Sequence, residues 1–318
     1  MSRRSAVKNV RKAKAPDASG IGPRQPCPCG SGKRYKACHG TAGGVVEVAV
    51  ARPFEGLAGE CELVALREFV PSGTAALPLV GQEREITLAT VLPMAAAALV
   101  RADGIAYVGL QVQTRSSDIS RDLARAVRWA LTAEPGDVLP VVGPDTDAGD
   151  KPERLQDLVA IDAPLEATVH TDFAWWMPAD SEPTGEVALS LERANSAILP
   201  TERVGPAAYW VDAGEKAHLR WVRPEPEEDL LAALARLHAR GELGIGDGSR
   251  YAGSFRAHGL LVPVWDLDRE PHAREWTEAV EQLGTRLDAA LASLADEPLT
   301  YDERRARDGL LGRQITIR

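Results

Sequence analysis

The sequence predicts an α+β protein in which a globular body follows a small cysteine-rich knuckle near the N-terminus. Three observations lead to this class. Apolar residues recur at helical spacing in several segments, β-rich runs flank short glycine-containing turns, and three of the four cysteines lie within residues 27–38. The 318 residues suffice for one large domain or two ordinary ones.

The N-terminal segment differs from the rest of the chain in charge. Residues 1–40 carry ten lysines and arginines against the single acid Asp17, so their net charge is +9, whereas the whole chain carries −9 and the remainder −18. Residues 1–25 show no apolar periodicity and are predicted to form a disordered basic arm. Such an arm either contacts an anionic partner (nucleic acid, ribosome, phospholipid or the acidic body) or is a solvated tail.

The first module of the body is predicted over residues 45–145. Residues 60–70 have helical apolar spacing, and residues 99–112 form two β-rich runs around an Ala-Asp-Gly turn. A helix follows, for which Ser117 or Asp118 is the expected N-cap.

The second module is predicted over residues 152–295 and repeats the same order. Residues 185–199 are a helical run, residues 209–222 a hairpin, and residues 223–241 a helix with acids in its first turn and Gly241 at its end.

A third hairpin is predicted at 255–268, followed by a long helix from about 270 to 295 and by a charged helix and tail over 296–318. The turns at 101–104 and 256–259 match in sequence as Arg-Ala-Asp-Gly and Arg-Ala-His-Gly. The two modules are therefore either a duplication or a chance recurrence of a common order of elements.

The knuckle at 26–40 has the ligand set of a structural zinc site. Pro28 stiffens the step between two cysteines, and residues 30–32 (Gly-Ser-Gly) allow the chain to reverse. Residues 33–37 are expected to form a short helix that returns the last two ligands to the metal. The four ligands are Cys27, Cys29, Cys38 and His39. Because the protein fills all four positions, one Zn²⁺ per chain would be structural and not catalytic.

This stretch, "PCPCGSGKRYKACHG", resembles the SEC-C motif, the zinc knuckle at the C-terminal end of the SecA translocase ATPase. The residues that match its turn and helix are Gly30, Ser31, Gly32, Lys33 and Tyr35. The resemblance implies docking, because the SecA knuckle contacts the export chaperone SecB and anionic lipid, and other copies are associated with the ribosome. It does not imply SecA's motor activity, since the chain shows no G-x-x-x-x-G-K-[ST] motif. As a whole, the chain resembles uncharacterised actinobacterial proteins, which supply no known activity.

The exposed side of the knuckle is expected to bind the partner. Its residues are Lys33, Arg34, Tyr35 and Lys36, a cationic set with one aromatic ring that suits a phosphate backbone or an acidic protein groove. A phosphate-binding loop at "GSGK" is the rival interpretation, but Arg34 stands where serine or threonine is required.

The body offers few residues with catalytic spacing. His170 and Asp172 could form an acid/base pair or part of a metal site, or could be alternating residues on the wet face of a strand. His258 is expected in a turn, and Cys61 is expected to be buried as a small apolar residue. No G-x-S-x-G motif is present, so no reaction is predicted.

The expected function is that of a cytoplasmic, non-catalytic zinc-binding adaptor that docks on a ribosome, an export chaperone or the translocation machinery. The alternatives are an enzyme of unrecognised chemistry that uses the knuckle only for targeting, and direct nucleic-acid binding through the basic arm. No run is apolar for the length of a bilayer, and no apolar segment follows the basic N-terminus as in a secretory signal. The sequence leaves the oligomeric state open.

Overall fold

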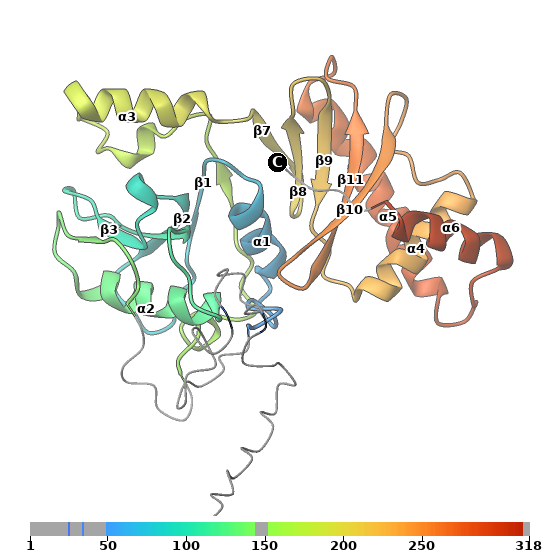
Figure 1. The fold of residues 1–318 in the computed structure, drawn as a ribbon, viewed down its shortest axis with the longest axis horizontal. Helices are drawn as coiled ribbons and strands as arrows, with labels where there is room; N and C mark the ends of the chain where they lie inside the picture. The colour runs from blue at the N-terminus through green and yellow to red at the C-terminus, as the bar shows by residue number, and fades with distance from the viewer. Residues whose placement is uncertain (1–24, 26–33, 35–48, 144–151, 314–318) are drawn as a thin grey trace, which may run out of the picture. The chain divides into compact units, whose positions relative to one another are not determined.

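The computed structural model describes Gln25, Arg34, residues 49–143 and residues 152–313. The chain separates into two compact units, Met1–Val48 and Ala49–Arg318. The predicted arm and knuckle therefore lie outside the described residues, apart from Gln25 and Arg34. The second unit is the body, and its described residues form a mixed α/β structure with six α-helices and two sheets (Figure 1).

The first sheet has six strands in the order β5-β3-β4-β2-β1-β6. Strands β2 and β4 are parallel, and every other neighbouring pair is antiparallel. The strands are β1 (Gly73–Ala76), β2 (Ile86–Val91), β3 (Ala98–Val100), β4 (Ala106–Gln111), β5 (Val138–Leu139) and β6 (Thr168–Val169).

The second sheet has five strands in the order β10-β11-β9-β8-β7, and all neighbouring pairs are antiparallel. The strands are β7 (Thr201–Gly205), β8 (Ala208–Asp212), β9 (Ala217–Trp221), β10 (Arg250–Ala257) and β11 (Leu260–Leu267). The pairs β7–β8, β8–β9 and β10–β11 are hairpins, whereas β9 and β11 pair across the intervening α4 and β10.

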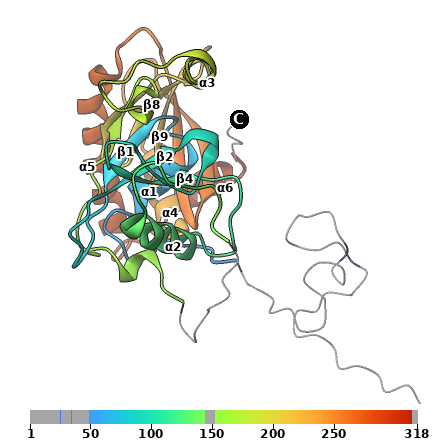
Figure 2. The same ribbon diagram turned by 90° about the vertical axis from the view of Figure 1, so that its left-hand side faces the viewer.

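Helices pack against both sheets of the body (Figures 1 and 2). The helices are α1 (Glu60–Glu68), α2 (Ile119–Thr132), α3 (Gly185–Ser196), α4 (Glu227–Ala239), α5 (Thr277–Ser293) and α6 (Tyr301–Leu311). Helices α1 and α2 pack on one face of the first sheet, and α4, α5 and α6 share a core with one face of the second. Helix α3 is exposed along most of its length, with Leu191 as its buried residue. No helix in the described part of the chain combines the length and the apolar composition that crossing a membrane requires.

One hydrophobic core joins the two sheets. It contains Leu88 and Val108 of the first sheet together with Tyr209 and Val262 of the second, all of them fully buried. Strand alternation explains this arrangement, because Val108 faces α1 and α2 while Tyr107 points to the opposite face of the same sheet. The body is therefore one packed unit and not two sheets on a linker.

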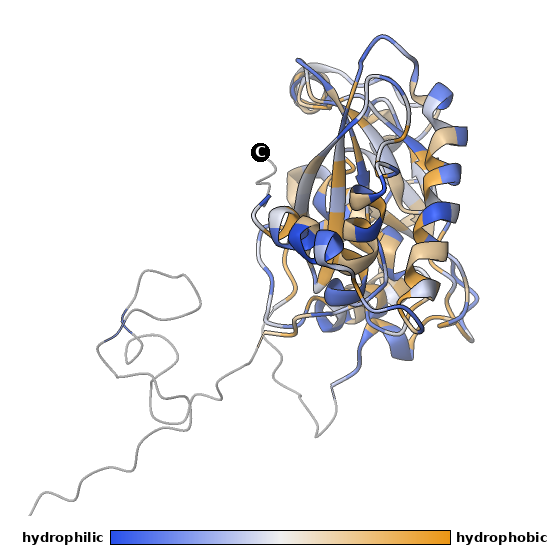
Figure 3. Ribbon diagram, turned by 90° about the vertical axis from the view of Figure 1, so that its right-hand side faces the viewer, coloured by the Kyte–Doolittle hydropathy of each residue, from blue (hydrophilic) through white to orange (hydrophobic). Residues whose placement is uncertain are grey.

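A second core lies between the other face of the second sheet and the C-terminal helices. Leu219 and Trp265 of the strands pack against Leu234 of α4, Leu283 of α5 and Leu310 of α6, each buried. Figure 3 views the body from this side and shows hydrophilic and hydrophobic segments alternating along the helices. This is the pattern of amphipathic helices that cover a sheet.

The structure confirms most elements predicted from sequence. The hairpins predicted at 99–112, 209–222 and 255–268 are the antiparallel pairs β3–β4, β8–β9 and β10–β11. Helices occur at each predicted position, including α6 within the predicted C-terminal segment. The glycines of the two matching turns, Gly104 and Gly259, have φ of +87° and +80°, which explains why glycine stands there.

Two expectations need correction, and a third is not confirmed. The long helix predicted from about residue 270 begins as a 3₁₀ turn (Ala273–Trp276), and α5 starts only at Thr277. The strand expected around His170 ends at Val169. Duplication is not confirmed, because β6 lies in the second predicted module but pairs with β1, and the parallel strands belong to the first sheet alone.

Of the two N-caps that the sequence allows for α2, Ser117 and Asp118, the structure shows Asp118. The Asp118 carboxylate accepts hydrogen bonds from the backbone N–H groups of Ser120 and Arg121, at 3.1 and 3.4 Å. It also forms an ion pair with Arg154 at 2.9 Å. Asp118→Ala should lower the free energy of unfolding by about 1 kcal/mol, because two backbone donors lose their acceptor. Urea denaturation measures this effect.

Asp118→Asn is the matched control, because it keeps an oxygen at the cap but removes the charge that pairs with Arg154. It should lose less stability than the alanine variant. Equal losses in the two variants would mean that the ion pair, and not the cap, matters at this position.

Candidate functional site

The residues predicted to hold zinc belong to the part of the chain outside the described ranges. Cys27, Cys29, Cys38 and His39 lie outside the described residues, as do Lys33, Tyr35 and Lys36. Arg34 is described and is exposed. Three thiols and one imidazole are nevertheless a donor set that suits Zn²⁺. Within the described ranges, no group of three or more His, Cys, Asp or Glu is arranged to hold a metal ion.

The predicted pair His170 and Asp172 is engaged in local structure. His170 Nε2 lies 2.8 Å from Thr74 Oγ1, and Asp172 accepts a hydrogen bond from the backbone N–H of Ala174 at 2.8 Å. Burial lowers the pKa of His170, which favours the neutral ring. In the described part of the molecule no hydrogen bond joins the two residues, so the geometry does not support an acid/base pair.

The tryptophans beside this pair are packing residues. Trp175 Nε1 donates to Ser72 Oγ at 2.9 Å, and Trp176 Nε1 donates to the Val91 carbonyl at 3.0 Å. The rings of Phe173 and Trp176 stack with their centroids 4.4 Å apart. Because both indole N–H groups are hydrogen-bonded, these aromatic residues need no ligand to complete their contacts and serve to cover the outer face of the first sheet.

A polar cleft lies at the carboxyl end of the parallel strands. Its lining residues come from the last turn of α1, from the end of β4 and from the segment that leads to α2, and its volume is about 230 Å³. They are Arg67, Glu68, Gln111, Val112, Gln113 and Arg115. We call this region the β4 cleft. Loops that follow parallel strands commonly form ligand sites.

Arg67 is a buried and incompletely paired cation in the β4 cleft. Arg67 is 9% exposed, and its Nη1 donates a hydrogen bond to the carbonyl of Leu110. Its Nε lacks a hydrogen-bond partner and lies 3.8 Å from the carboxylate of Glu68. Burial lowers the pKa of Arg67, as expected for a charge withdrawn from water.

The carboxylate of Glu68 is held by His258. His258 Nε2 lies 2.7 Å from Glu68 Oε1 and comes from the β10–β11 turn, as the sequence predicted. This hydrogen bond lowers the pKa of Glu68, so that the side chain remains ionised. His258 has φ of +48°, which is unusual for a residue other than glycine. The second sheet thus contributes to the rim of a cleft built mainly on the first.

Two glutamines fix the backbone around the β4 cleft. Gln111 Nε2 donates to the Leu66 carbonyl at 3.2 Å, and Gln113 Nε2 donates to the Met94 carbonyl at 2.6 Å. Met94 and Ala95 follow β2 and have φ of +56° and +50°. Backbone strain of this kind is enriched at functional sites.

Arg115 completes the β4 cleft. It is exposed, and no hydrogen bond or ion pair joins it to the described residues. Its charge contributes to lowering the pKa of both Arg67 and Glu68, so the three groups interact electrostatically. No sequence motif marks Arg67, Glu68 or Arg115 as site residues. The available signal is the alternation of Gln111, Gln113 and Arg115 at the end of a buried strand.

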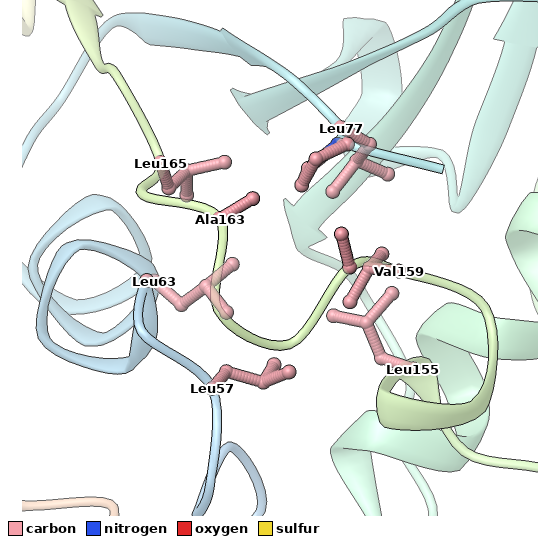
Figure 4. A pocket seen from close by; sticks show the side chains of 10 residues that line it. Leu57, Leu63, Leu77, Leu155, Val159, Ala163 and Leu165 are labelled. Atoms are coloured by element: carbon pink, nitrogen blue, oxygen red, sulfur yellow. The ribbon is translucent and has the colours of Figure 1, made fainter. Parts of the chain in front are cut away.

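The apolar cavity in Figure 4 is a packing gap. Its volume is about 20 Å³, and the leucines and alanines that surround it offer no polar side chain. The labelled lining residues are Leu57, Leu63, Leu77, Leu155, Val159, Ala163 and Leu165. A space of this size admits at most one water molecule, which would find no side-chain hydrogen-bond partner there.

The comparisons with known proteins agree with this division into a knuckle and a body. A SEC-C motif matches residues 24–41, which confirms the resemblance of the knuckle sequence. Residues 53–318 match a family of unknown function, DUF5926, and the chain belongs to this family. Neither the curated proteins nor the solved structures contain a match.

Proposed function

We propose that the chain is a zinc-binding adaptor whose SEC-C knuckle docks on an anionic partner. The match of residues 24–41 to the SEC-C motif carries this proposal, since it contains the four ligands Cys27, Cys29, Cys38 and His39. Zn²⁺ would fold a segment too short to bury a core of its own. The ion has a structural role because no ligand position is left for substrate.

Charge supports the docking role. The net charge of +9 over residues 1–40 favours a phosphate-rich or acidic surface and predicts binding that weakens with salt. Lys33, Arg34, Tyr35 and Lys36 are the proposed contacts in the knuckle. A cytoplasmic ribosome, export chaperone or translocation complex fits this chemistry, and the body would supply a second, separate contact.

Zinc content tests the site directly. Wild type should contain one zinc per chain, and Cys38→Ser should lose most of it because a hydroxyl is a poor substitute for a thiolate. Cys61→Ser is the matched control, since Cys61 lies on α1 and burial raises the pKa of its thiol to about 12. Elemental analysis under reducing conditions measures the metal, and circular dichroism checks that the body remains folded. Wild type without zinc, or Cys38→Ser with full zinc, would refute the site.

Partner capture tests the docking role. Wild type should retain a ribosomal, chaperone or translocation partner from lysate at low salt and release it at high salt, whereas Cys38→Ser should retain much less. Undiminished capture by Cys38→Ser would contradict docking through the knuckle even if the zinc site is correct.

A second candidate function is favoured by the β4 cleft alone. An enzyme could use this cleft for its chemistry and the knuckle for targeting. The ionised Glu68, its partner His258 and the two arginines are the groups available there. They define a binding surface but do not by themselves specify a reaction.

A further inference from the structure

We propose that the β4 cleft binds a small molecule through a phosphate or carboxylate group. The position of the cleft is the first argument. Strands β2 and β4 are the parallel pair of the described sheets, and the segments that follow them, which contain Met94 and Gln113, are joined by a hydrogen bond at the cleft. The carboxyl end of parallel strands is where open sheets bind ligands.

The charge balance of the cleft is the second argument. Arg67 and Arg115 bring two positive charges, while Glu68 is already hydrogen-bonded by His258. Asp122 lies nearby, and its carboxylate accepts a hydrogen bond from the backbone N–H of Ser116 at 2.7 Å. Both carboxylates are thus hydrogen-bonded by other groups. The buried Arg67 approaches Glu68 only at 3.8 Å, and the exposed Arg115 has no carboxylate partner among the described residues.

The free guanidinium of Arg115 identifies the ligand group. It has no partner among the described residues, and Arg67 adds a second positive charge to the cleft, although its own Nε is buried beside Glu68. Guanidinium groups bind the oxygens of phosphate and carboxylate through paired hydrogen bonds. An oxyanion bound by Arg115 would lie close to the charge of Arg67 and reduce the repulsion between the two cations.

Gln111 and the volume of the cleft indicate which other groups the ligand carries and how large it is. Gln111 uses its amide N–H groups on the carbonyls of Leu66 and Val70, at 3.2 and 3.5 Å, so its side-chain oxygen remains as an acceptor. A ligand with a hydroxyl or amino group beside its oxyanion could donate to this oxygen. The cleft volume of about 230 Å³ suits a molecule of few heavy atoms.

A wider groove between α4 and α6 fits such a ligand less well. Its volume is about 330 Å³, but its polar residues are exposed on the helix surfaces. They are His238, Asp302, Arg305 and Arg313. Unlike the β4 cleft, this groove contains no buried cation that lacks a partner.

Isothermal titration calorimetry of the full-length chain with inorganic phosphate and, separately, succinate tests the proposal. Wild type should bind at least one of the two probes weakly, in the millimolar range expected for so small a ligand. Arg115→Gln should weaken binding about tenfold, because a charge-assisted hydrogen-bonded contact is lost. The probe that binds more tightly distinguishes a phosphate ligand from a carboxylate ligand.

Arg193→Gln is the matched control, because Arg193 is exposed on α3 and its side chain has no partner among the described residues. This variant should bind as wild type does. The basic N-terminal arm is present in every protein compared, so binding to the arm alone would leave Arg115→Gln unchanged. That result, an equal loss in both variants, or binding of neither probe would overturn the proposal. Zinc content is independent of all three outcomes.

Discussion

Arg236→Ala is expected to lower the free energy of unfolding by about 3–5 kcal/mol, the largest single effect we anticipate in the body. Arg236 lies on α4 and is 1% exposed. Its Nε forms an ion pair with Glu303 Oε1 at 3.1 Å, and its Nη groups donate to Ser293 Oγ at 2.5 Å and to the Glu297 carbonyl at 2.7 Å. One side chain therefore connects α4 with the end of α5 and the start of α6.

The loss is large because Glu303 would remain buried without its cation. Glu303 is 5% exposed and also forms the capping box of α6 with Thr300. Urea denaturation measures the change, and hydrogen exchange should show α6 opening before the strands. Arg240→Ala is the control, because Arg240 is exposed at the C-terminal end of the same helix. If both variants lose the same stability, the buried network is not the cause.

Glu62→Ala is expected to cost about 3 kcal/mol, because it leaves several donors between the two sheets without an acceptor. Glu62 lies on α1 and is 6% exposed. Its carboxylate accepts hydrogen bonds from the Tyr209 hydroxyl at 2.5 Å and the Ala207 N–H at 2.9 Å, and it lies 2.7 Å from Arg203 Nη2. This carboxylate is thus a buried polar link between α1 and the second sheet, in addition to the Glu68–His258 contact and the shared core.

Tyr209→Phe separates the hydroxyl from the rest of this network. It removes one donor and keeps the ring that packs edge-on against Phe69. The expected loss is about 1 kcal/mol. Chemical denaturation of the two variants should therefore give clearly different midpoints. A Tyr209→Phe variant as unstable as Glu62→Ala would show that packing around the hydroxyl dominates over the carboxylate.

Local signals explain why most elements could be predicted. Glycine at a left-handed turn and alternating apolar runs identified the hairpins, as Gly104 and Gly259 show. The start of α2 could be predicted because Ser117 and Asp118 are both favourable N-caps, and Asp118 is the one whose side chain accepts backbone hydrogen bonds. The pairing of β1 with β2 and β6, and the parallel register of β2 and β4, depend on contacts distant in sequence that local patterns do not encode.

The β4 cleft could not be predicted for the same reason, because its residues come from segments distant in sequence. In the sequence, Arg67 and Glu68 belong to a segment with helical spacing and Gln111 to a β-rich run, and neither pattern indicates a ligand site. His258 lies 190 positions from Glu68, so their contact could not be inferred from spacing. The proposed zinc site is the opposite case, because the four residues predicted to bind the metal lie within thirteen residues and a single sequence motif contains them all.

The core shared by the two sheets restricts how the body can be shortened. A truncated fragment ending before β7 would expose the apolar faces of α1 and the first sheet, while the complementary fragment would expose Tyr209, Val222 and Val262. Each fragment would then expose a large hydrophobic patch that favours aggregation. Recombinant fragments for crystallography or binding assays should therefore keep residues 49–313 intact. A chimera that exchanges one sheet would have to preserve the apolar residues that both sheets contribute to the shared core.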